Sequence, residues 1–321
     1  MAPNVLLFGT GSVGTVYAWV LSKSATVTTI CRSNYEEASK NGFTIHSTVW
    51  GNDLKVKPTV ARTVPQAIEL ANGKPFDYIL VATKALPSKP STAELIRPAV
   101  SKSTTIALIQ NGVGIESEFA AAYPDNALLS CVVYLPATQV SSAVVQHKEV
   151  ELLHIGTYPA EAGPAAKEAA TAFTELVRSA GASAKLHDDV QFERWSKLLV
   201  NGSWNPICAL TKLRDRQFID AHDDALDFVR DVMLEICSVA QACGYAGINK
   251  DKVDFQIGRA SVRELPGVQL SMMADALARR SLEVDAVIGN VVRLAKAKGV
   301  GVPLLRSIYL LVNGLNRSFA I

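Results

Sequence analysis

A lysine and two asparagines recur at intervals of four residues near the middle of the chain. On a helix, Lys197, Asn201 and Asn205 would share one face over two turns, because side chains four residues apart lie above one another. Adding hydride to a ketone creates an alkoxide that must be stabilised and protonated as it forms, and a protonated lysine does both. Neighbouring amides can hold a substrate carboxylate or hydroxyl without adding charge. The stripe indicates a carbonyl-reduction site with Lys197 as general acid; the alternative is a solvated helix face.

Other polar residues accompany this stripe. Pro206 directly follows it and is expected to end or kink the helix, which would leave Asn205 near a terminus. Asparagine lowers helix propensity, so two of them inside a helix favour a functional reason for their presence. Farther along, Ser271 could bind a substrate carboxylate, and Glu283 could reach a cofactor or substrate hydroxyl. Helix capping by the serine and a favourable helix dipole for the glutamate explain these two residues as well.

Three glycines follow the first apolar segment in the spacing of a dinucleotide-binding loop. Residues 4–8 predict a strand, and a helix-compatible segment follows the glycines and runs to residue 21. In that context Gly9 permits a tight turn, Gly11 lets the backbone approach a pyrophosphate, and Gly14 lets helix and strand pack closely. The helix N-terminus would meet the phosphate charge. The predicted loop consists of Gly9, Thr10, Gly11, Ser12, Val13 and Gly14, and the alternative is an ordinary turn.

The end of the second predicted strand favours NADP(H) over NAD(H). An acidic residue at this point would hold the ribose 2′-hydroxyl of NAD, but the chain has Cys-Arg-Ser-Asn at 31–34. The guanidinium of Arg32 can bind a 2′-phosphate, and Ser33 and Asn34 can add neutral hydrogen bonds. A solvated surface arginine is the alternative, and Glu36 and Glu37 are the nearest carboxylates that could reverse the preference.

Two polar residues directly follow later strands. Lys84 comes after the apolar run 78–82, and Asn111 comes after the apolar run 105–109. Open α/β sheets bind ligands at the carboxyl ends of their parallel strands, where both side chains would lie. A solvated loop lysine and a simple Asn-Gly turn are the alternatives.

The elements that must position these residues change in kind along the chain. Strand-like segments alternate with plausible helices up to about residue 133, which predicts a parallel, doubly wound sheet. Residues 144–147 and 151–154 predict two antiparallel strands near the sheet edge, followed by a helix over 164–178 and a last strand over 182–186. Only helical segments follow. We therefore expect an α/β fold, with an N-terminal Rossmann-type domain over 1–187 and a C-terminal all-helical substrate domain over 188–321.

Bulk composition argues against several kinds of partner. The 321 residues carry a net charge of +2 and no cluster of basic residues, which disfavours nucleic acid and membrane surfaces. No run of 18 apolar residues and no secretory signal is present, so we expect a cytoplasmic protein. The five cysteines and five histidines lack metal-ligand spacing, so we expect no metal. The apolar runs 232–236 and 308–312 could face a second copy in a homodimer, and internal packing explains them equally well.

Taken together, these motifs resemble the ketopantoate reductase family, also called 2-dehydropantoate 2-reductases. The resemblance covers essentially the whole chain and begins with the glycine loop, the arginine after the second strand, Thr-Lys-Ala at 83–85 and Asn-Gly-Val-Gly at 111–114. It continues with Trp-x-Lys-Leu-x-x-Asn-x-x-x-Asn-Pro at 195–206, and with Ser-Met at 271–272, twelve residues before Glu283. Together these motifs are more specific than any one of them.

The resemblance implies an NADPH-dependent oxidoreductase that converts ketopantoate, a small 2-keto acid, to pantoate in pantothenate biosynthesis. By matching position, Lys197 would be the general acid, and the substrate-binding set would be Asn111, Asn201, Asn205 and Ser271. Besides the glycine loop, the NADP(H)-binding set would be Arg32, Lys84, Asn111, Glu283 and, by a weaker match, Ala137.

Two departures from the family pattern affect these expectations differently. Thr10 and Ser12 replace the usual alanines of the loop, and both are small enough for it. The segment 130–138 contains Val-Val-Tyr-Leu-Pro instead of the usual Thr- and His-containing stretch, so another bulky 2-keto acid or 2-hydroxy acid is an open alternative. A non-catalytic NADP(H) sensor is a further alternative. The polar residues of the helical domain argue against it, because a sensor needs only the glycine loop.

Overall fold

The computed structural model describes residues 2–321, which fall into two compact units. The first comprises the chain up to Lys84, Ser88–Gln110 and Glu116–Val190; the second comprises Ala85–Pro87, Asn111–Ile115 and Gln191–Ile321. The division after residue 190 lies three residues beyond the expected one. The two short segments of the second unit were not expected from the sequence, and tertiary hydrogen bonds described below hold them there.

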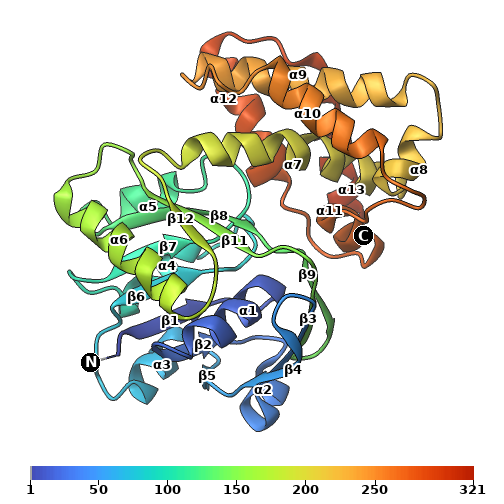
Figure 1. Ribbon diagram of the computed structural model, residues 1–321. Helices are drawn as coiled ribbons and strands as arrows, with labels where there is room; N and C mark the ends of the chain where they lie inside the picture. The colour runs from blue at the N-terminus through green and yellow to red at the C-terminus, as the bar shows by residue number, and fades with distance from the viewer. Residues whose placement is uncertain (1) are drawn as a thin grey trace. The chain divides into compact units, whose positions relative to one another are not determined.

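The first unit is built on an eight-stranded sheet in the order β12-β11-β8-β7-β6-β1-β2-β5 (Figure 1). Its strands are β1 (Asn4–Phe8), β2 (Thr26–Ile30), β5 (Thr59–Ala61), β6 (Tyr78–Val81), β7 (Thr105–Leu108), β8 (Leu128–Tyr134), β11 (Leu152–Thr157) and β12 (Ala184–Leu186). Neighbouring strands from β5 to β8 are parallel, whereas β11 is antiparallel to β8 and parallel to β12. The strand order reverses beside β1, as in dinucleotide-binding sheets. This arrangement confirms the predicted Rossmann-type sheet.

The helices of this unit connect the strands and complete its core. They are α1 (Ser12–Leu21), α2 (Tyr35–Asn41), α3 (Val64–Leu70), α4 (Thr92–Ile96) with the 3₁₀ turn η1 (Arg97–Ala99), α5 (Ser117–Ala122) and α6 (Pro164–Ser179). Strand β7 is buried along its whole length, which is typical of a central parallel strand covered on both faces. Side chains of β1, α1 and α6 share one hydrophobic cluster, so burial of apolar surface fixes the helix that follows the glycine loop.

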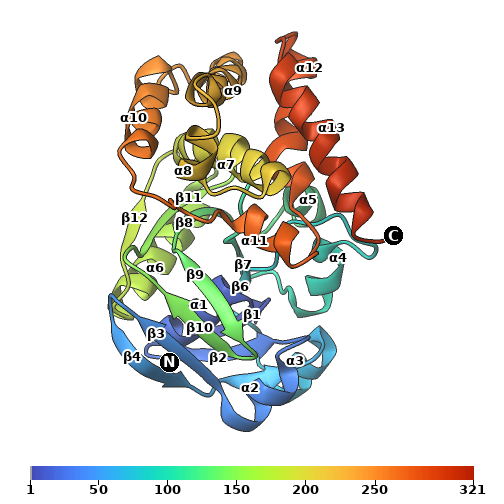
Figure 2. The ribbon, with the colours of Figure 1, turned by 90° about the vertical axis from the view of Figure 1, so that its right-hand side faces the viewer.

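A second sheet of four strands makes one of the predicted pairings wrong. Its order is β4-β3-β10-β9, with β3 (Phe43–Ser47), β4 (Gly51–Val56), β9 (Ala137–Ser141) and β10 (Val144–His147) (Figure 2). Residues 144–147 therefore do not join residues 151–154 at the edge of the main sheet. Instead β10 pairs with β3 and β9. Val145 and His147 are fully buried while Gln146 is exposed, because one face of β10 packs toward α1.

The second unit is helical, as predicted for this part of the chain. Its helices are α7 (Gln191–Thr211), α8 (Asp215–Ile219), α9 (Ala225–Ala242), α10 (Lys250–Ser261), α11 (Ser271–Leu277), α12 (Asn290–Lys298) and α13 (Pro303–Ser318), with a π-helical turn η2 (Asp285–Gly289) before α12. The expectation that Pro206 places Asn205 near a helix end is wrong, because α7 continues to Thr211. Pro206 and its neighbours are buried, so tertiary packing overrides the local cost of proline inside a helix.

Helix α7 lies in the hydrophobic core of this unit. Leu198, Leu199 and Trp204 pack in one cluster with apolar side chains of α9, α12 and α13. The apolar run 232–236 belongs to the same core through Val232, Met233 and Ile236. In the run 308–312, Ile308 and Val312 are buried, but Leu310 and Leu311 are exposed. None of the helices described over residues 2–321 is long and apolar enough to cross a membrane.

Candidate active site

The glycine loop of the first unit has the backbone geometry that its three glycines predict. Gly9 has a φ of +105°, and an added Cβ would lie 2.7 Å from the backbone nitrogen of Thr83. At Gly14 a Cβ would lie 2.0 Å from the carbonyl oxygen of Gly9, so this glycine is required for helix and loop to pack. A Cβ at Gly11 would meet nothing within 4 Å. The protein itself therefore gives no steric reason for Gly11, and open space at this position fits the close approach of a pyrophosphate.

Neighbouring side chains hold the loop against the end of β2. The hydroxyl of Thr10 donates to Sγ of Cys31 at 3.0 Å, and the amide Nδ2 of Asn34 donates to the carbonyl oxygen of Thr10 at 2.6 Å. Asn34 is buried and also accepts a hydrogen bond from Nε2 of Gln139 at 2.9 Å. We expected Asn34 to offer a hydrogen bond to a 2′-phosphate, but its amide is engaged in supporting the loop. The N-terminus of α1 begins at Ser12, where backbone N–H groups are available to an anion.

Arg32 is exposed at the end of β2, where the ribose of a dinucleotide is recognised in this fold. The two carboxylates that could oppose it have other partners. Glu36 forms an ion pair with Arg62, and Glu37 accepts a hydrogen bond from Asn41 at 2.7 Å. These contacts leave Arg32 as the charged group directly after β2, and its guanidinium fits a 2′-phosphate better than a 2′-hydroxyl.

The other two residues expected to bind cofactor in this unit lie on different elements. Lys84 follows β6 and is partly buried. Ala137 begins β9 of the second sheet, where it pairs with His147 of β10. Sequence reasoning could place Lys84 after a strand, but it gave no sign that Ala137 belongs to a separate sheet.

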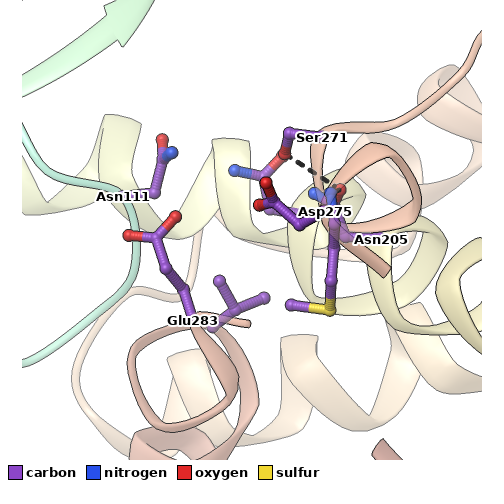
Figure 3. Close-up of a pocket in the computed structure, with 8 residues that line it drawn as sticks. Asn111, Asn205, Ser271, Asp275 and Glu283 are labelled. Atoms are coloured by element: carbon purple, nitrogen blue, oxygen red, sulfur yellow. Dashed lines mark hydrogen bonds between the residues drawn. The ribbon is translucent and has the colours of Figure 1, made fainter. Parts of the chain in front are cut away.

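In the second unit the structure brings most of the predicted polar residues to one pocket (Figure 3). The pocket is lined by Asn111, Asn201, Asn205, Ser271, Met272, Asp275, Glu283 and Val287. These residues come from α7, from α11, from η2 and the segment just before it, and from the short segment that contains Asn111. Five of the eight were predicted from the sequence as substrate or cofactor ligands, and the remaining polar one is Asp275.

Lys197 is linked to this pocket through Asn111. Its Nζ donates a hydrogen bond to Oδ1 of Asn111 at 2.8 Å. Burial, and to a smaller extent the positive charge of Arg194, lowers the pKa of the Lys197 ammonium from 10.5 to about 7, against a smaller opposing effect of Glu283. An amine with this pKa can give or accept a proton near neutral pH, which is the requirement for a general acid–base group.

Tertiary contacts fix Asn111 relative to the helices. Gly112 has a φ of +103°, and a Cβ there would lie 2.3 Å from the carbonyl oxygen of Ala286. The backbone N–H of Val113 donates to that same oxygen at 3.1 Å, and Nη1 of Arg194 donates to the carbonyl oxygen of Gly112 at 2.8 Å. The Asn-Gly pair is therefore more than a turn, because only glycine allows the backbone to lie against η2.

The second short segment is held in a similar way. The backbone N–H of Ala85 donates to Oε1 of Glu283 at 2.9 Å. Glu283 lies just before η2, and π-helical turns occur frequently at functional sites. The carboxylate thus has a structural hydrogen bond in addition to its position in the pocket lining.

Asn205 connects α7 to α11. Its Oδ1 accepts hydrogen bonds from Oγ of Ser271 at 3.2 Å and from the backbone N–H of Met272 at 3.0 Å. Ser271 is not the N-cap of α11, which is Leu270, and it makes no capping hydrogen bond. The capping explanation of Ser271 is therefore wrong, and its hydroxyl is directed to the pocket residue Asn205 instead (Figure 3).

Two charged residues near this pocket received no role from the sequence. Arg194 is buried and holds Gly112, and Asp275 lines the pocket. The spacing between Ser271 and Asp275 is four residues, which places both on one face of α11 and is the only signal that the sequence offered. Nothing in the sequence pattern indicated that Arg194 contacts a segment 82 residues away.

Comparison with known proteins gives matches along most of the chain. The family model described as "Ketopantoate reductase PanE/ApbA" matches residues 5–160, and its C-terminal counterpart matches residues 189–316. A 2-dehydropantoate 2-reductase of Mycobacterium tuberculosis is 30% identical, over 95% of this chain and 95% of the relative. An uncharacterized protein of Saccharomyces cerevisiae is 29% identical, over 95% of this chain and 91% of that protein. The crystal structure of 2-dehydropantoate 2-reductase from Methylococcus capsulatus superposes with a TM-score of 0.84 at 30% identity, covering 99% of this chain and 98% of that one.

Proposed function

Because the chain belongs to the ketopantoate reductase family, we propose that it reduces ketopantoate to pantoate with NADPH. Members of this family are NADP-dependent oxidoreductases that act on CH–OH groups, and the chain is a 2-keto acid reductase of this type. The reduction of ketopantoate is supported above all by the hydrogen bond from Lys197 to Asn111. Asn111 lines the pocket together with Asn201, Asn205, Ser271 and Glu283. A proton donor and uncharged amide ligands are what reduction of a hydroxylated keto acid requires.

The residues of each unit have separate tasks in this proposal. The loop Gly9, Thr10, Gly11, Ser12, Val13 and Gly14 would hold the pyrophosphate of NADPH, and Arg32 its 2′-phosphate. Lys84 and Ala137 would contact the rest of the cofactor. Bound NADPH supplies the hydride that the carbonyl carbon accepts.

The remaining steps belong to side chains of the second unit. The ammonium of Lys197 donates its proton to the carbonyl oxygen, so that the product is an alcohol and the amine becomes neutral. Asn201, Asn205 and Ser271 hydrogen-bond to the carboxylate and hydroxyl of the substrate, and the Ser271 hydroxyl, which donates to Oδ1 of Asn205 in this structure, rotates to do so. Asn111 orients the lysine amine, and Glu283 accepts a hydrogen bond from a substrate or cofactor hydroxyl.

The test is a spectrophotometric assay that follows loss of NADPH absorbance with ketopantoate and with a panel of other 2-keto acids. We expect ketopantoate to give the highest kcat/KM, and NADH to be a poorer cofactor. A higher kcat/KM for another bulky 2-keto acid would reassign the substrate and keep the chemistry. NADPH binding without turnover on any 2-keto acid would instead favour a sensor.

The role of Lys197 has its own test. Lys197→Ala should reduce kcat by about 10²- to 10⁴-fold, the usual range for loss of a general acid, while the Kd for NADPH stays within a few-fold of the parent value. Lys296→Ala removes an exposed lysine of α12 and serves as the matched control. Near-normal turnover of the Lys197 variant would contradict the assignment.

Two expectations about the whole protein remain part of this proposal. The five cysteines are free thiols, which supports a reducing, cytoplasmic location. A homodimer is the second expectation, and Leu310 and Leu311 are the exposed part of the apolar run that suggested it. Light scattering on the purified protein measures its oligomeric state directly.

A further inference from the structure

The pocket of the second unit has two carboxylates in its lining, although we propose that it binds an anion. Asp275 and Glu283 both line it, together with amide and hydroxyl groups (Figure 3). A 2-keto acid brings a carboxylate of its own. Like charges that approach within a few ångströms in a partly buried site repel strongly, so at least one of the two protein carboxylates needs compensation.

Asp275 lies one helical turn from Ser271, whose hydroxyl we expect to bind the substrate carboxylate. It follows Ser271 by one turn of α11, and its side chain is only 12% exposed. Its carboxylate lies in the same pocket lining as Ser271 and Asn205 (Figure 3). An uncompensated charge at Asp275 would act directly on an anion held by the Ser271 hydroxyl.

Arg280 supplies the compensation. Its Nε donates to Oδ1 of Asp275 at 2.9 Å, and its backbone N–H donates to the Asp275 carbonyl oxygen at 2.9 Å. The Arg280 side chain is 59% exposed, so the guanidinium reaches the carboxylate from the solvent side. The adjacent Arg279 has the same charge but other contacts, since its Nη2 donates to the carbonyl oxygen of Ser318 at 3.1 Å.

We propose that Arg280 raises the affinity of this pocket for anionic substrates by neutralising Asp275. The inference rests on the proposed function, because it assumes that the ligand is a 2-keto acid. Arg280 acts through Asp275 as a positioning and charge-compensating residue and takes no part in proton transfer. Loss of the arginine should therefore weaken substrate binding and leave the chemical step nearly unchanged.

The test is a double-mutant cycle on kcat and KM. Arg280→Gln should raise KM for the 2-keto acid about 10- to 100-fold, as expected for an unscreened like charge a few ångströms from the substrate, with kcat within about threefold of the parent. Arg280→Lys keeps the positive charge, and its KM should lie between those of the parent and of Arg280→Gln. Asp275→Asn should not raise KM, because it removes the repelling charge itself.

The decisive variant is Asp275→Asn/Arg280→Gln. Neutralisation predicts that KM returns to within a few-fold of the parent value, since neither charge remains. A direct contact between Arg280 and the substrate predicts a KM as high as in Arg280→Gln, and that result would overturn the proposal. Arg279→Gln is the matched control and should leave KM unchanged. Because Arg280 is largely exposed, we expect its single variants to fold; Asp275 is buried, but Asn has nearly the same size as Asp, and thermal unfolding verifies the fold of every variant.

Binding of oxamate, an unreactive anion that carries the 2-oxo carboxylate group shared by all 2-keto acids, separates this inference from the proposed function. Its Kd is measured calorimetrically in the presence of NADPH for the same five variants. If the Kd for oxamate rises in Arg280→Gln and returns in the double variant, but no 2-keto acid is reduced, the proposed function is wrong and the charge compensation stands. If 2-keto acids are reduced and neither KM nor Kd follows the pattern, only the charge compensation fails. Absence of both turnover and oxamate binding overturns both.

Discussion

At neutral pH the Lys197 amine is divided between its charged and neutral forms, because burial and the charge of Arg194 lower its pKa to about 7. Reduction needs the protonated form as the acid, whereas oxidation of the alcohol needs the neutral form as the base. We therefore expect kcat/KM for reduction to fall as the pH rises through about 7, and kcat/KM for oxidation to rise over the same interval. Rate profiles in both directions from pH 5.5 to 9.5 measure this. Parallel profiles that fall together would exclude Lys197 as the titrating group.

The two charges that act on Lys197 have opposite effects and give a second prediction. Arg194→Met removes the charge that lowers the Lys197 pKa, so the midpoint of the reduction profile should move to higher pH. Glu283→Gln removes the charge that raises this pKa, so the midpoint should move to lower pH.

Arg194 also holds the Gly112 carbonyl, so loss of kcat alone would not distinguish electrostatics from misplacement of Asn111. The shift of the midpoint makes that distinction, because a purely structural effect lowers the rate without moving the profile. Arg259→Met, in an exposed arginine of α10, is the control and should leave the midpoint where it is. Midpoints that move in the same direction in both variants would contradict the assignment of the charges.

At the scale of elements, the glycine loop makes a prediction that separates folding from cofactor binding. Gly14→Ala places a Cβ 2.0 Å from a backbone oxygen, so we expect a loss of more than about 2 kcal/mol in the free energy of unfolding. Gly11→Ala meets nothing within 4 Å, so stability should change by less than about 1 kcal/mol, while the Kd for NADPH rises about tenfold or more. Denaturant unfolding and fluorescence titration provide the two measurements. Unchanged NADPH affinity in Gly11→Ala would remove the loop from the cofactor site.

The elements that the sequence predicted well are those whose structure is determined locally. The segment from β1 through the loop to α1 combines a buried strand, a glycine spacing and an apolar, mostly buried helix within 18 residues, and all three signals agree. The second sheet was missed for the opposite reason. Strands β3 and β10 lie about a hundred residues apart in the chain, and exposed β4 has little hydrophobic alternation, so their pairing depends on tertiary contacts.

The same distinction applies to the site. The four-residue spacing of Lys197, Asn201 and Asn205 could be recognised because one helix carries all three. The contacts of Asn111 with Lys197 and of Glu283 with Ala85 join segments 86 and 198 residues apart, and no local pattern predicts them. The helix end predicted at Pro206 was wrong for a related reason, because the local effect of this proline is outweighed by burial of the surrounding turn.

At the scale of the whole molecule, cofactor choice should be visible as a change in stability. A ligand that binds only the folded protein at about 100 times its Kd stabilises it by roughly 2.7 kcal/mol, so NADPH should raise the Tm by several degrees. NADH at the same concentration should raise it less, because Arg32 has no 2′-phosphate to bind. Equal shifts with the two cofactors would contradict the proposed preference for NADPH.

Arg32→Ser turns this comparison into a test of a single side chain. Charge-assisted hydrogen bonds to phosphate contribute about 1.5–3 kcal/mol, so the Kd for NADPH should rise roughly 10- to 100-fold while the Kd for NADH stays nearly constant. Arg178→Ser removes an exposed arginine of the same unit that pairs with Glu175, and it should affect neither cofactor. If both Kd values rise together in Arg32→Ser, the arginine supports the loop rather than reading the phosphate. Glu36 is paired with Arg62, and Glu37 accepts a hydrogen bond from Asn41, so the two nearest carboxylates are already engaged. We therefore expect Arg32→Ser to lose NADPH affinity without gaining any for NADH.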